Sequence, residues 1–231
     1  MSYDVLAGLA AFAGVVVLMR LRRAITRRIP ALERMRELNR LEDERKRALP
    51  KYPPVVRASD RVGRFTTLAF FFLVVPLVGT LAPQPVLRGL RDVVLILMTY
   101  DLAYYLTHRF VFHGPLMREI HAVHHQARHP TYIDAQYVHP LETFIGMALF
   151  VGAVVVLAPL LGRFHAATLA TSFFLFSQLN VLNHTKIELP EPPYRILTWI
   201  SAKHAVHHEN MRKGNYATIS LAYDWLFGTL E

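Results

Sequence analysis

The chain of 231 residues contains no cysteine, which excludes disulfides, zinc fingers, thiolate-bound iron–sulfur clusters and cysteine nucleophiles. Charged residues are also scarce, at 19% of the chain against 53% for hydrophobic residues. Soluble domains usually have about 25% charged residues. The composition therefore argues against a disordered chain and against an ordinary soluble domain, and the length allows one domain with or without an appendage.

Up to five apolar stretches approach the length needed to cross a bilayer, whose hydrocarbon core requires about 20 mostly apolar residues per helix. They are Val5–Met19, Phe65–Leu81, Val93–Leu106, Phe144–Leu161 and Ala166–Leu182. Five such stretches in a short chain leave too little polar surface for a soluble fold. The sequence therefore predicts an all-α integral membrane protein.

The formal net charge is +9, and the basic residues are unevenly distributed over this topology. If all five stretches span the membrane, every Lys and Arg except Arg88, Arg91 and Arg163 falls on one side. The positive-inside rule makes that side cytoplasmic, so the C-terminus is cytoplasmic and the N-terminus lies outside. The topology explains the basic character, and we expect no nucleic-acid partner.

Three segments follow from these patterns. Residues 1–20 are expected to form an N-terminal transmembrane anchor that is retained, since no clear cleavage site follows it. Residues 21–64 form a basic cytosolic segment, in which Ala31–Leu49 is either an amphipathic helix on the membrane surface or a solvated charged linker. Pro50, Pro53 and Pro54 are expected to end it. Residues 65–231 form the main membrane domain.

The chain has twelve histidines, and only His165 falls on the predicted outer side. The pentapeptide His-Ala-Val-His-His occurs twice, at His121–His125 and at His204–His208. On an α-helix, residues i, i+3 and i+4 share one face, so each triplet has the geometry for chelating a metal from one helix. A solvated histidine face could explain one such triplet but explains two identical triplets poorly.

Two further histidine positions accompany the triplets. His108 and His113 lie about 140° apart on a regular helix, so they could clasp a metal only from a helix end and the turn that follows. Asn180 and His184 lie four residues apart at the end of the last apolar stretch. Polar side chains there would be costly against lipid, so we expect them to face an interior site.

Asp101 interrupts an otherwise apolar stretch, seven residues before His108. A carboxylate inside a membrane span is a functional candidate by default. Its expected role is to accept the ring N–H of a ligand histidine and so fix the orientation of that ring. The alternative is a structural pairing with Arg109, Tyr104 or Tyr105.

The histidine count leaves more than one metal open. Two tetrahedral zinc sites would use eight histidines, which is the number of strong positions before His184 is added. Imidazole also suits iron, which prefers more ligands and open positions. Imidazole ligation without thiolate or haem, next to lipid, favours a non-haem di-iron centre that uses O₂.

The motifs His108-x4-His113, His121-x2-His124-His125 and His204-x2-His207-His208 resemble the histidine boxes of the fatty acid hydroxylase / sterol desaturase superfamily. The flanking segments are similar to that family too. These segments are Asp101–Tyr105, His139–Glu142, Asn215–Tyr216 and Asp224–Thr229. The resemblance covers residues 91–231.

This resemblance implies a four-helix transmembrane core, here Phe65–Leu182, with an extra N-terminal span and a cytosolic helical cap that holds the histidines. It implies two iron ions, O₂ as co-substrate, and a membrane lipid substrate, fatty acyl or sterol-like, that is hydroxylated or alternatively desaturated. It also implies a separate electron donor of the ferredoxin or cytochrome b5 type. The implied metal ligands are His108, His113, His121, His124, His125, His184, His204, His207 and His208.

Some positions depart from the family pattern or have no assigned role. Asn180 occupies a position where family hydroxylases often have a further histidine, and an asparagine there could hold a metal-bound water. Together with Asp101 it is the candidate catalytic residue. His139 is either a ligand or a group behind the ligands, and His129 and His165 are expected to be ordinary surface histidines.

A function of another class also fits a histidine-rich membrane protein. The chain could be a zinc-binding structural protein or a transporter of divalent cations. A transporter should place its ligands near the bilayer midplane within broken helices. The histidines here cluster outside the predicted spans, which favours the enzyme.

Overall fold

The computed structural model describes residues 3–189 and 191–231, and most of them are helical. The long helices are α1 (Val5–Arg28), α2 (Pro30–Arg47), α3 (Tyr52–Ala69), α5 (Val86–Thr107), α7 (Pro140–Leu161), α8 (Ala166–Asn183) and α9 (Arg195–Glu209). The shorter elements are the π-helices η1 (Phe70–Val74) and η2 (His108–Phe112), the 3₁₀ turns η3 (His124–Gln126) and η4 (Tyr132–Ala135), helices α4 (Val75–Val78), α6 (Arg118–His121) and α10 (Ala222–Leu226), and strands β1 (Gly79–Thr80) and β2 (Phe164–His165).

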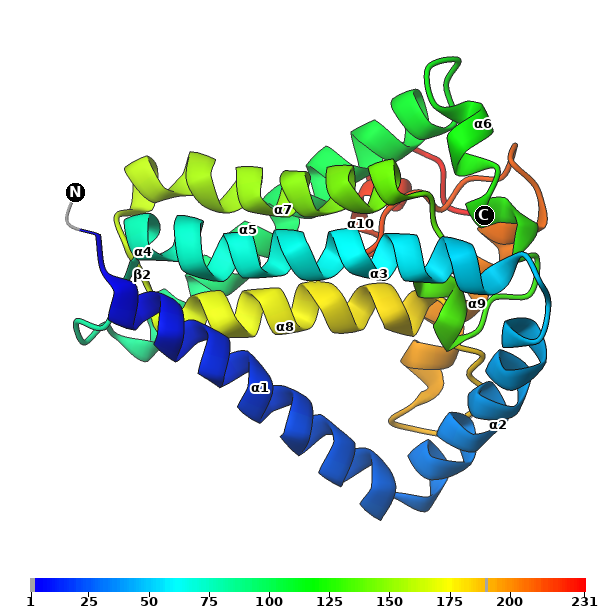
Figure 1. Ribbon diagram of the computed structural model, residues 1–231, viewed down its shortest axis with the longest axis horizontal. Helices are drawn as coiled ribbons and strands as arrows, with labels where there is room; N and C mark the ends of the chain where they lie inside the picture. Colours follow the sequence, from blue (N-terminus) through cyan, green and yellow to red (C-terminus); the bar gives the residue numbers. More distant parts are fainter. Residues whose placement is uncertain (1–2, 190) are drawn as a thin grey trace.

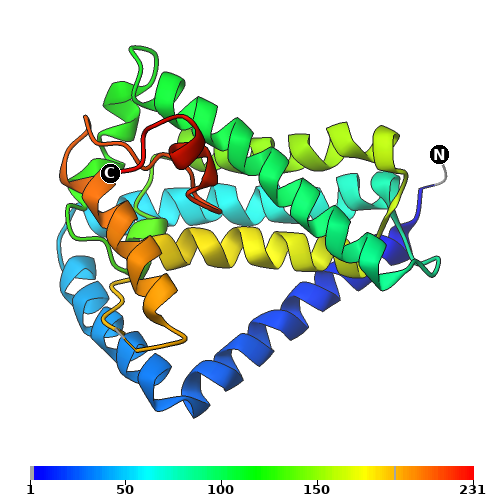
Figure 2. The same ribbon diagram turned by 180° about the vertical axis from the view of Figure 1, so that it is seen from behind.

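Helices α3, α5, α7 and α8 lie alongside one another and form the body of the molecule (Figures 1 and 2). Aromatic rings join them at the centre. The ring of Phe150 on α7 lies 5.4 Å from that of Phe70, which continues α3, and 4.5 Å from that of Phe176 on α8. Phe176 in turn lies 4.9 Å from Tyr100 on α5. Each such contact adds to the burial of large apolar surfaces, so the rings hold the four helices together.

Three of the described helices are long and apolar enough to cross a membrane: Val5–Arg28, Tyr52–Val78 and Pro140–Leu161. The other two expected spans also form helices, α5 and α8, but these do not reach the same hydropathy. They bury polar groups inside the bundle, among them Asp92 and Asp101 on α5 and Asn183 on α8. Of the five predicted spans, three are therefore confirmed as helices apolar enough to cross a membrane.

Helix α1 packs on the outside of this bundle, against α8 and η1. Its contact face consists of small residues, with Ala7 and Ala11 fully buried, and the N–H of Asp4 donates to the carbonyl of Pro76 at 2.8 Å. Toward its C-terminal end α1 diverges from α8 (Figure 1). The extra N-terminal helix is therefore attached by one end.

Helix α2 resolves the alternative for the segment Ala31–Leu49, because the structure has a docked helix there and not a solvated linker. Met35 packs against Ile187 and Leu189, which follow α8. The side chain of Asn39 is fully buried; it donates to the carbonyl of Lys186 at 2.9 Å and accepts from its N–H at 3.0 Å. Helix α2 thus returns the chain to the end of the bundle where α8 finishes.

The prolines between α2 and α3 act differently from the expectation. Pro53 and Pro54 lie in the first turn of α3, and the helix begins at Tyr52 instead of Phe65. Proline is tolerated in a first turn because the backbone N–H groups there have no partner within the helix. Of the three expected terminators, only Pro50 lies between the two helices.

The two ends of the bundle have different structures. One end carries the parallel pair β1–β2, in which Gly79 is opposite Phe164. The other end carries η2, α6, η3, η4 and α9, which close over the bundle as a helical cap (Figure 1). Both histidine triplets lie in this cap.

The packing of α1 through small residues can be tested at Gly8. A Cβ atom there would meet the backbone oxygen of Phe71 at 2.5 Å, so Gly8→Leu must displace α1. Overpacking of this kind costs about 1–3 kcal/mol. We expect a lower melting temperature in detergent, whereas Leu9→Ala, on the exposed side of α1, should leave it unchanged. Equal melting temperatures for Gly8→Leu and the unmodified protein would contradict this packing.

Candidate metal centre

All nine histidines predicted as ligands lie together in the cap, in two groups. In each group the ring nitrogens that could bind a metal lie within 4.8 Å of one another. Group one consists of His108, His113, His121, His125 and His207, and group two of His124, His184, His204 and His208. The two groups are adjacent, since the rings of His125 and His208 stack across the boundary with centroids 5.1 Å apart.

The pair His108 and His113 is brought together by a π-helix. Residues His108–Phe112 form η2, and the N–H of His113 donates to the carbonyl of His108 at 3.0 Å. This i→i+5 bond widens the turn, so two residues that would diverge on an α-helix face the same way, with ring centroids 5.0 Å apart. The expected clasp between a helix end and its following turn is therefore made by a π-helical turn.

The three histidines of a triplet do not all belong to one group, although their spacing predicted that each triplet would hold one metal from one helix. His121 and His125 belong to group one, whereas His124 belongs to group two. The first triplet is also not on a continuous α-helix, because α6 ends at His121 and the 3₁₀ turn η3 starts at His124. The second triplet, on α9, divides the other way, with His207 in group one.

The division on α9 has a geometric cause. On a regular helix His207 is rotated by about 60° from His204 and by about 100° from His208. The three rings therefore fan out enough to serve two centres lying side by side. Each triplet contributes to both groups, and this couples the two groups to each other.

Backbone carbonyls orient most of the rings. The Nδ1–H of His108 donates to Tyr216 O at 2.7 Å, that of His207 to Gly214 O at 2.7 Å, and that of His113 to Met211 O at 2.8 Å. In group two, Nδ1–H of His184 and His124 donate in the same way, to carbonyls of residues 180 and 137. Because a neutral imidazole has one N–H, these rings direct the Nε2 lone pair into the group.

Burial keeps these imidazoles neutral. It lowers the pKa of His113 to about 4 and those of His121 and His184 to about 3, because the protonated ring would lose its hydration. Neutral nitrogen with a free lone pair is the form that binds a metal.

The residues present fit a metal at each group. Nε2 of His108 lies 3.0 Å from Nε2 of His121 and 3.1 Å from Nε2 of His207, although all three rings hold their proton at Nδ1. At these contacts the lone pairs of the two nitrogens face each other, so the nitrogens form no hydrogen bond with one another. A cation between the nitrogens satisfies all three at once.

Glu142 contacts one of the clustered histidines, and the sequence analysis assigned it no role. Its Oε1 accepts from Nδ1–H of His121 at 2.9 Å, and both side chains are buried. The signal was available, because Glu142 ends the motif that begins at His139, at the start of α7. His139 belongs to neither described group; its Nδ1 accepts from the N–H of Leu141 and caps α7.

Asp101 has a different role from the one expected. Its carboxylate accepts from the backbone N–H groups of Thr218, Ile219 and Ser220 at 2.9–3.1 Å and from the hydroxyl of Ser220 at 3.0 Å. These four donors stand where the sequence predicted a ligand histidine, or alternatively Arg109, Tyr104 or Tyr105, as the partner of Asp101. Asp101 therefore anchors the C-terminal segment to α5.

Asp224 fixes the neighbouring part of that segment. It is fully buried and accepts from the N–H groups of Tyr216 and Ala217 at 2.8 and 2.9 Å. Tyr216 supplies the carbonyl that orients His108. The two carboxylates thus act on the candidate metal site indirectly, by holding the loop that orients His108.

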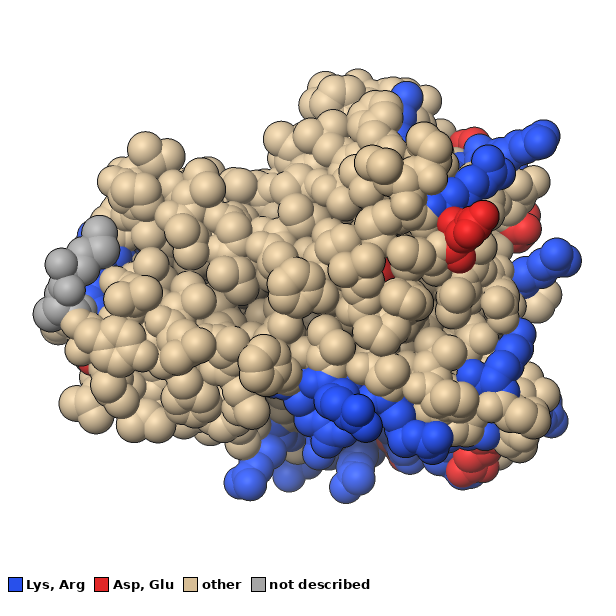
Figure 3. Space-filling view, turned by 45° about the horizontal axis from the view of Figure 1, so that its top comes forward, with Lys and Arg blue, Asp and Glu red and all other residues tan. Residues whose placement is uncertain are grey.

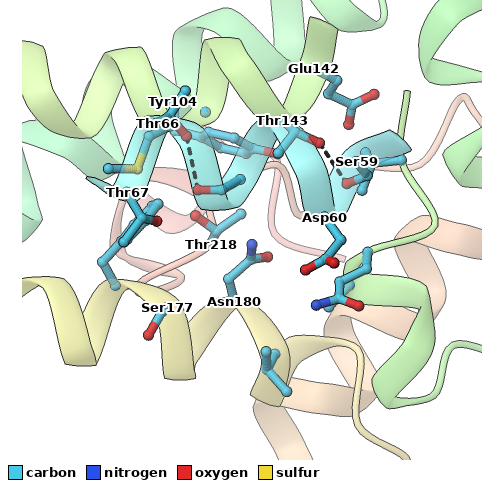
Figure 4. Close-up of a pocket in the computed structure, with 18 of the residues that line it drawn as sticks. Ser59, Asp60, Thr66, Thr67, Tyr104, Glu142, Thr143, Ser177, Asn180 and Thr218 are labelled. Carbon is cyan, nitrogen blue, oxygen red and sulfur yellow. Dashed lines mark hydrogen bonds between the residues drawn. The ribbon is translucent and has the colours of Figure 1, made fainter. Parts of the chain in front are cut away.

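A cavity of about 550 Å³ extends from the histidines into the bundle between α3, α5, α7 and α8. His108, His124, His184 and His204 line one end of it, and Phe12 of α1 lies at its wall. The side chain of Asn180 lies toward the cavity, among Thr218, Asp60 and Ser177 (Figure 4). Asn180 is in neither histidine group, but its carbonyl accepts from His184.

The match to known families agrees with this site. A profile of the fatty acid hydroxylase family matches residues 93–229, which include all nine histidines. The chain therefore belongs to the fatty acid hydroxylase family, as its histidine motifs predicted. No solved structure matches it.

The curated relatives are named as methylsterol monooxygenases and very-long-chain aldehyde decarbonylases. The chain is 32% identical over 132 residues to methylsterol monooxygenase 1 of Rattus norvegicus, covering 56% of this chain and 43% of that protein. It is 31% identical over 137 residues to a very-long-chain aldehyde decarbonylase of Oryza sativa subsp. indica, covering 56% and 48%. A methylsterol monooxygenase of Aspergillus fumigatus is 26% identical over 194 residues, covering 78% and 64%. The chain spans about half the length of the relatives it matches.

The contact between Glu142 and His121 predicts a specific defect. Glu142→Gln replaces the carboxyl group that accepts from His121 with an amide, and if His121 is a ligand, changes of this kind reduce metal affinity about 10–100-fold. We expect faster loss of metal to a chelator, measured by elemental analysis. Glu119→Gln, a nearby exposed residue, serves as the control. Retention equal to that of the unmodified protein would show that Glu142 does not support the site.

The anchor at Asp101 predicts a structural defect. Asp101→Ala removes the acceptor of three backbone N–H groups, that of buried Thr218 and those of partly buried Ile219 and Ser220, which should cost about 3 kcal/mol. The melting temperature in detergent should fall by several degrees, and a protease should cut the segment after α9 sooner. Glu42→Gln, in an exposed ion pair with Arg45, should change neither. A resistant C-terminal segment in Asp101→Ala would refute the anchor.

Proposed function

We propose that the protein is an O₂-dependent di-iron membrane oxygenase that hydroxylates an unactivated C–H bond of a lipid. The observation that carries this proposal is the arrangement of the nine histidines. They form two adjacent groups, and four of them line the end of a cavity that runs into the apolar bundle. A substrate in that cavity would lie directly against the metal site.

Iron explains the five histidines of group one better than zinc does. A structural zinc ion takes four ligands, and group one offers five. Iron accepts more ligands and leaves positions open for a co-substrate. When bound, a pair of iron ions supplies the capacity to activate O₂ and to oxidise a strong C–H bond.

The side chains around the cavity are proposed to bind the lipid substrate and to exclude water from the metal site. Phe173, Phe176 and Met147 provide apolar cavity walls that suit a lipid chain, and eight of the nine histidines are buried. Excluding water protects a strong oxidant from side reactions. No side chain is required as a general base. Asp101 is therefore assigned a structural role, and Asn180 is the remaining candidate for direct contact with substrate or with a metal-bound water.

The substrate is proposed to enter sideways from the bilayer. The cavity reaches Phe12 on α1, and α1 diverges from the bundle toward its C-terminal end (Figure 1). The names of the curated relatives support a sterol-like or long-chain lipid. Desaturation on the same site is the alternative outcome, and a product that gains one oxygen atom distinguishes hydroxylation from a product that loses two hydrogen atoms.

The same topology supports proposals about location and electron supply. Placing the cap on the side that carries most arginines makes the histidine site cytoplasmic. The electrons are proposed to come from a separate ferredoxin or cytochrome b5 type protein, and an acidic partner would be attracted to this basic side. Activity that does not respond to ionic strength would count against such docking.

Single ligand substitutions test the proposal. His125→Ala and His207→Ala each remove a donor from group one, and His124→Ala and His208→Ala each remove one from group two. We expect each to abolish the lipid product, measured by mass spectrometry of cell lipids, and to lower the iron content of the purified protein. His129→Ala and His165→Ala should retain iron and product.

Metal analysis separates the proposal from its rival. Protein made in iron-replete cells should contain iron at both groups and consume O₂ when a reductant and lipid are supplied. Zinc alone without oxygen consumption would support a structural zinc protein. Full activity with full iron content in any ligand variant would refute the ligand assignment.

A further inference from the structure

A second, smaller cavity lies away from the histidine site, where the end of α1 meets α2 and η4. Its volume is about 180 Å³. The residues that line it are Arg22, Arg23, Thr26, Arg27, Arg36 and Tyr132. Four of these six residues are arginines, so the cavity concentrates positive charge in a small space.

Part of that charge forms no close ion pair in the protein. Arg36 pairs with Glu33 and Glu37 on α2. Arg22, Arg23 and Arg27 form no ion pair with any residue in the described ranges 3–189 and 191–231. The Nε atom of Arg22 is buried and has no hydrogen-bond acceptor there. A buried guanidinium N–H without an acceptor is costly and points to a ligand that supplies one.

The cavity lies at the level where a lipid headgroup would be expected. The apolar part of α1 ends at Met19, and the arginines begin with Arg20. In the space-filling view a broad tan face is bordered below by a dense patch of Lys and Arg (Figure 3). Arginine near the end of a span lies at the membrane–water interface.

We propose that this arginine cavity binds a phosphate group. Guanidinium groups bind phosphate oxygens through paired, charge-assisted hydrogen bonds, and Arg is preferred over Lys for such contacts. A cavity for a whole drug-sized ligand has about 300–1,000 Å³, so this one suits a headgroup phosphate whose tails remain in the bilayer. The phosphate belongs either to an anionic lipid or to free phosphate in solution.

A bound phosphate would also connect three parts of the structure. Arg22 and Arg23 lie on α1, Arg36 lies on α2, and Tyr132 starts η4. The same η4 segment reaches the main cavity through Ala135. The ligand would therefore hold the junction of α1 and α2 against the cap, and this site does not depend on the proposed oxygenase function.

Native mass spectrometry of the full-length protein in detergent tests the site. The probes are dioleoyl phosphatidic acid, dioleoylglycerol, which lacks the phosphate, and inorganic phosphate. We expect the unmodified protein to retain phosphatidic acid and not dioleoylglycerol. The variant Arg22→Gln/Arg23→Gln/Arg27→Gln should bind phosphatidic acid about 10-fold more weakly or worse, since several charge-assisted bonds are lost.

A matched variant controls for net charge. Arg47→Gln/Arg57→Gln/Arg61→Gln removes three exposed arginines that lie outside the cavity, and it should bind phosphatidic acid as the unmodified protein does. Arg23→Gln alone removes one exposed side chain and preserves the packing; it should weaken binding several-fold. Melting temperatures show whether each variant is folded.

The outcomes are distinguishable. Inorganic phosphate bound as tightly as phosphatidic acid identifies free phosphate as the source, and phosphate bound only as lipid identifies the headgroup. Equal binding of dioleoylglycerol and phosphatidic acid, equal losses in the two triple variants, or unchanged binding by Arg23→Gln and the cavity triple variant would each overturn the proposal.

Discussion

Neutral imidazoles that direct their lone pairs toward one another are the constraint on which the rest of this structure depends. The Nε2 atoms of His108, His121 and His207 approach to 3.0–3.1 Å with no proton between them. Such contacts are unfavourable without a cation, and burial prevents protonation from relieving them. The cap therefore has the chemistry of a metal-binding site, and its irregular backbone supplies carbonyls that orient the rings.

Those carbonyls connect the metal centre to the whole bundle. Tyr216, which orients His108, lies in a loop held by Asp224, and the adjoining residues 218–220 are held by Asp101 on α5. The C-terminal segment is thus fixed to a helix more than a hundred residues earlier in the chain. The cavity lies between the same helices, so the elements that line it also hold the loop that orients His108.

The sequence predicted the features that depend on local spacing. Helices form at all five predicted apolar stretches, although only three of them are apolar enough to cross a membrane, and the nine histidines named from the motifs and the family resemblance do cluster. Features that depend on distant partners could not be predicted. The donors to Asp101 lie 117–119 residues away, the π-helical turn at His108 has no local signature, and the division of each triplet between two groups depends on how α6, η3 and α9 meet. What the histidines bind stays a prediction.

The central claim is that each histidine group holds one iron ion. Anomalous diffraction at the iron absorption edge, from crystals of protein purified from iron-replete cells, tests it most directly. The account predicts two peaks, one within group one and one within group two. A single peak, or iron located outside both groups, would contradict it.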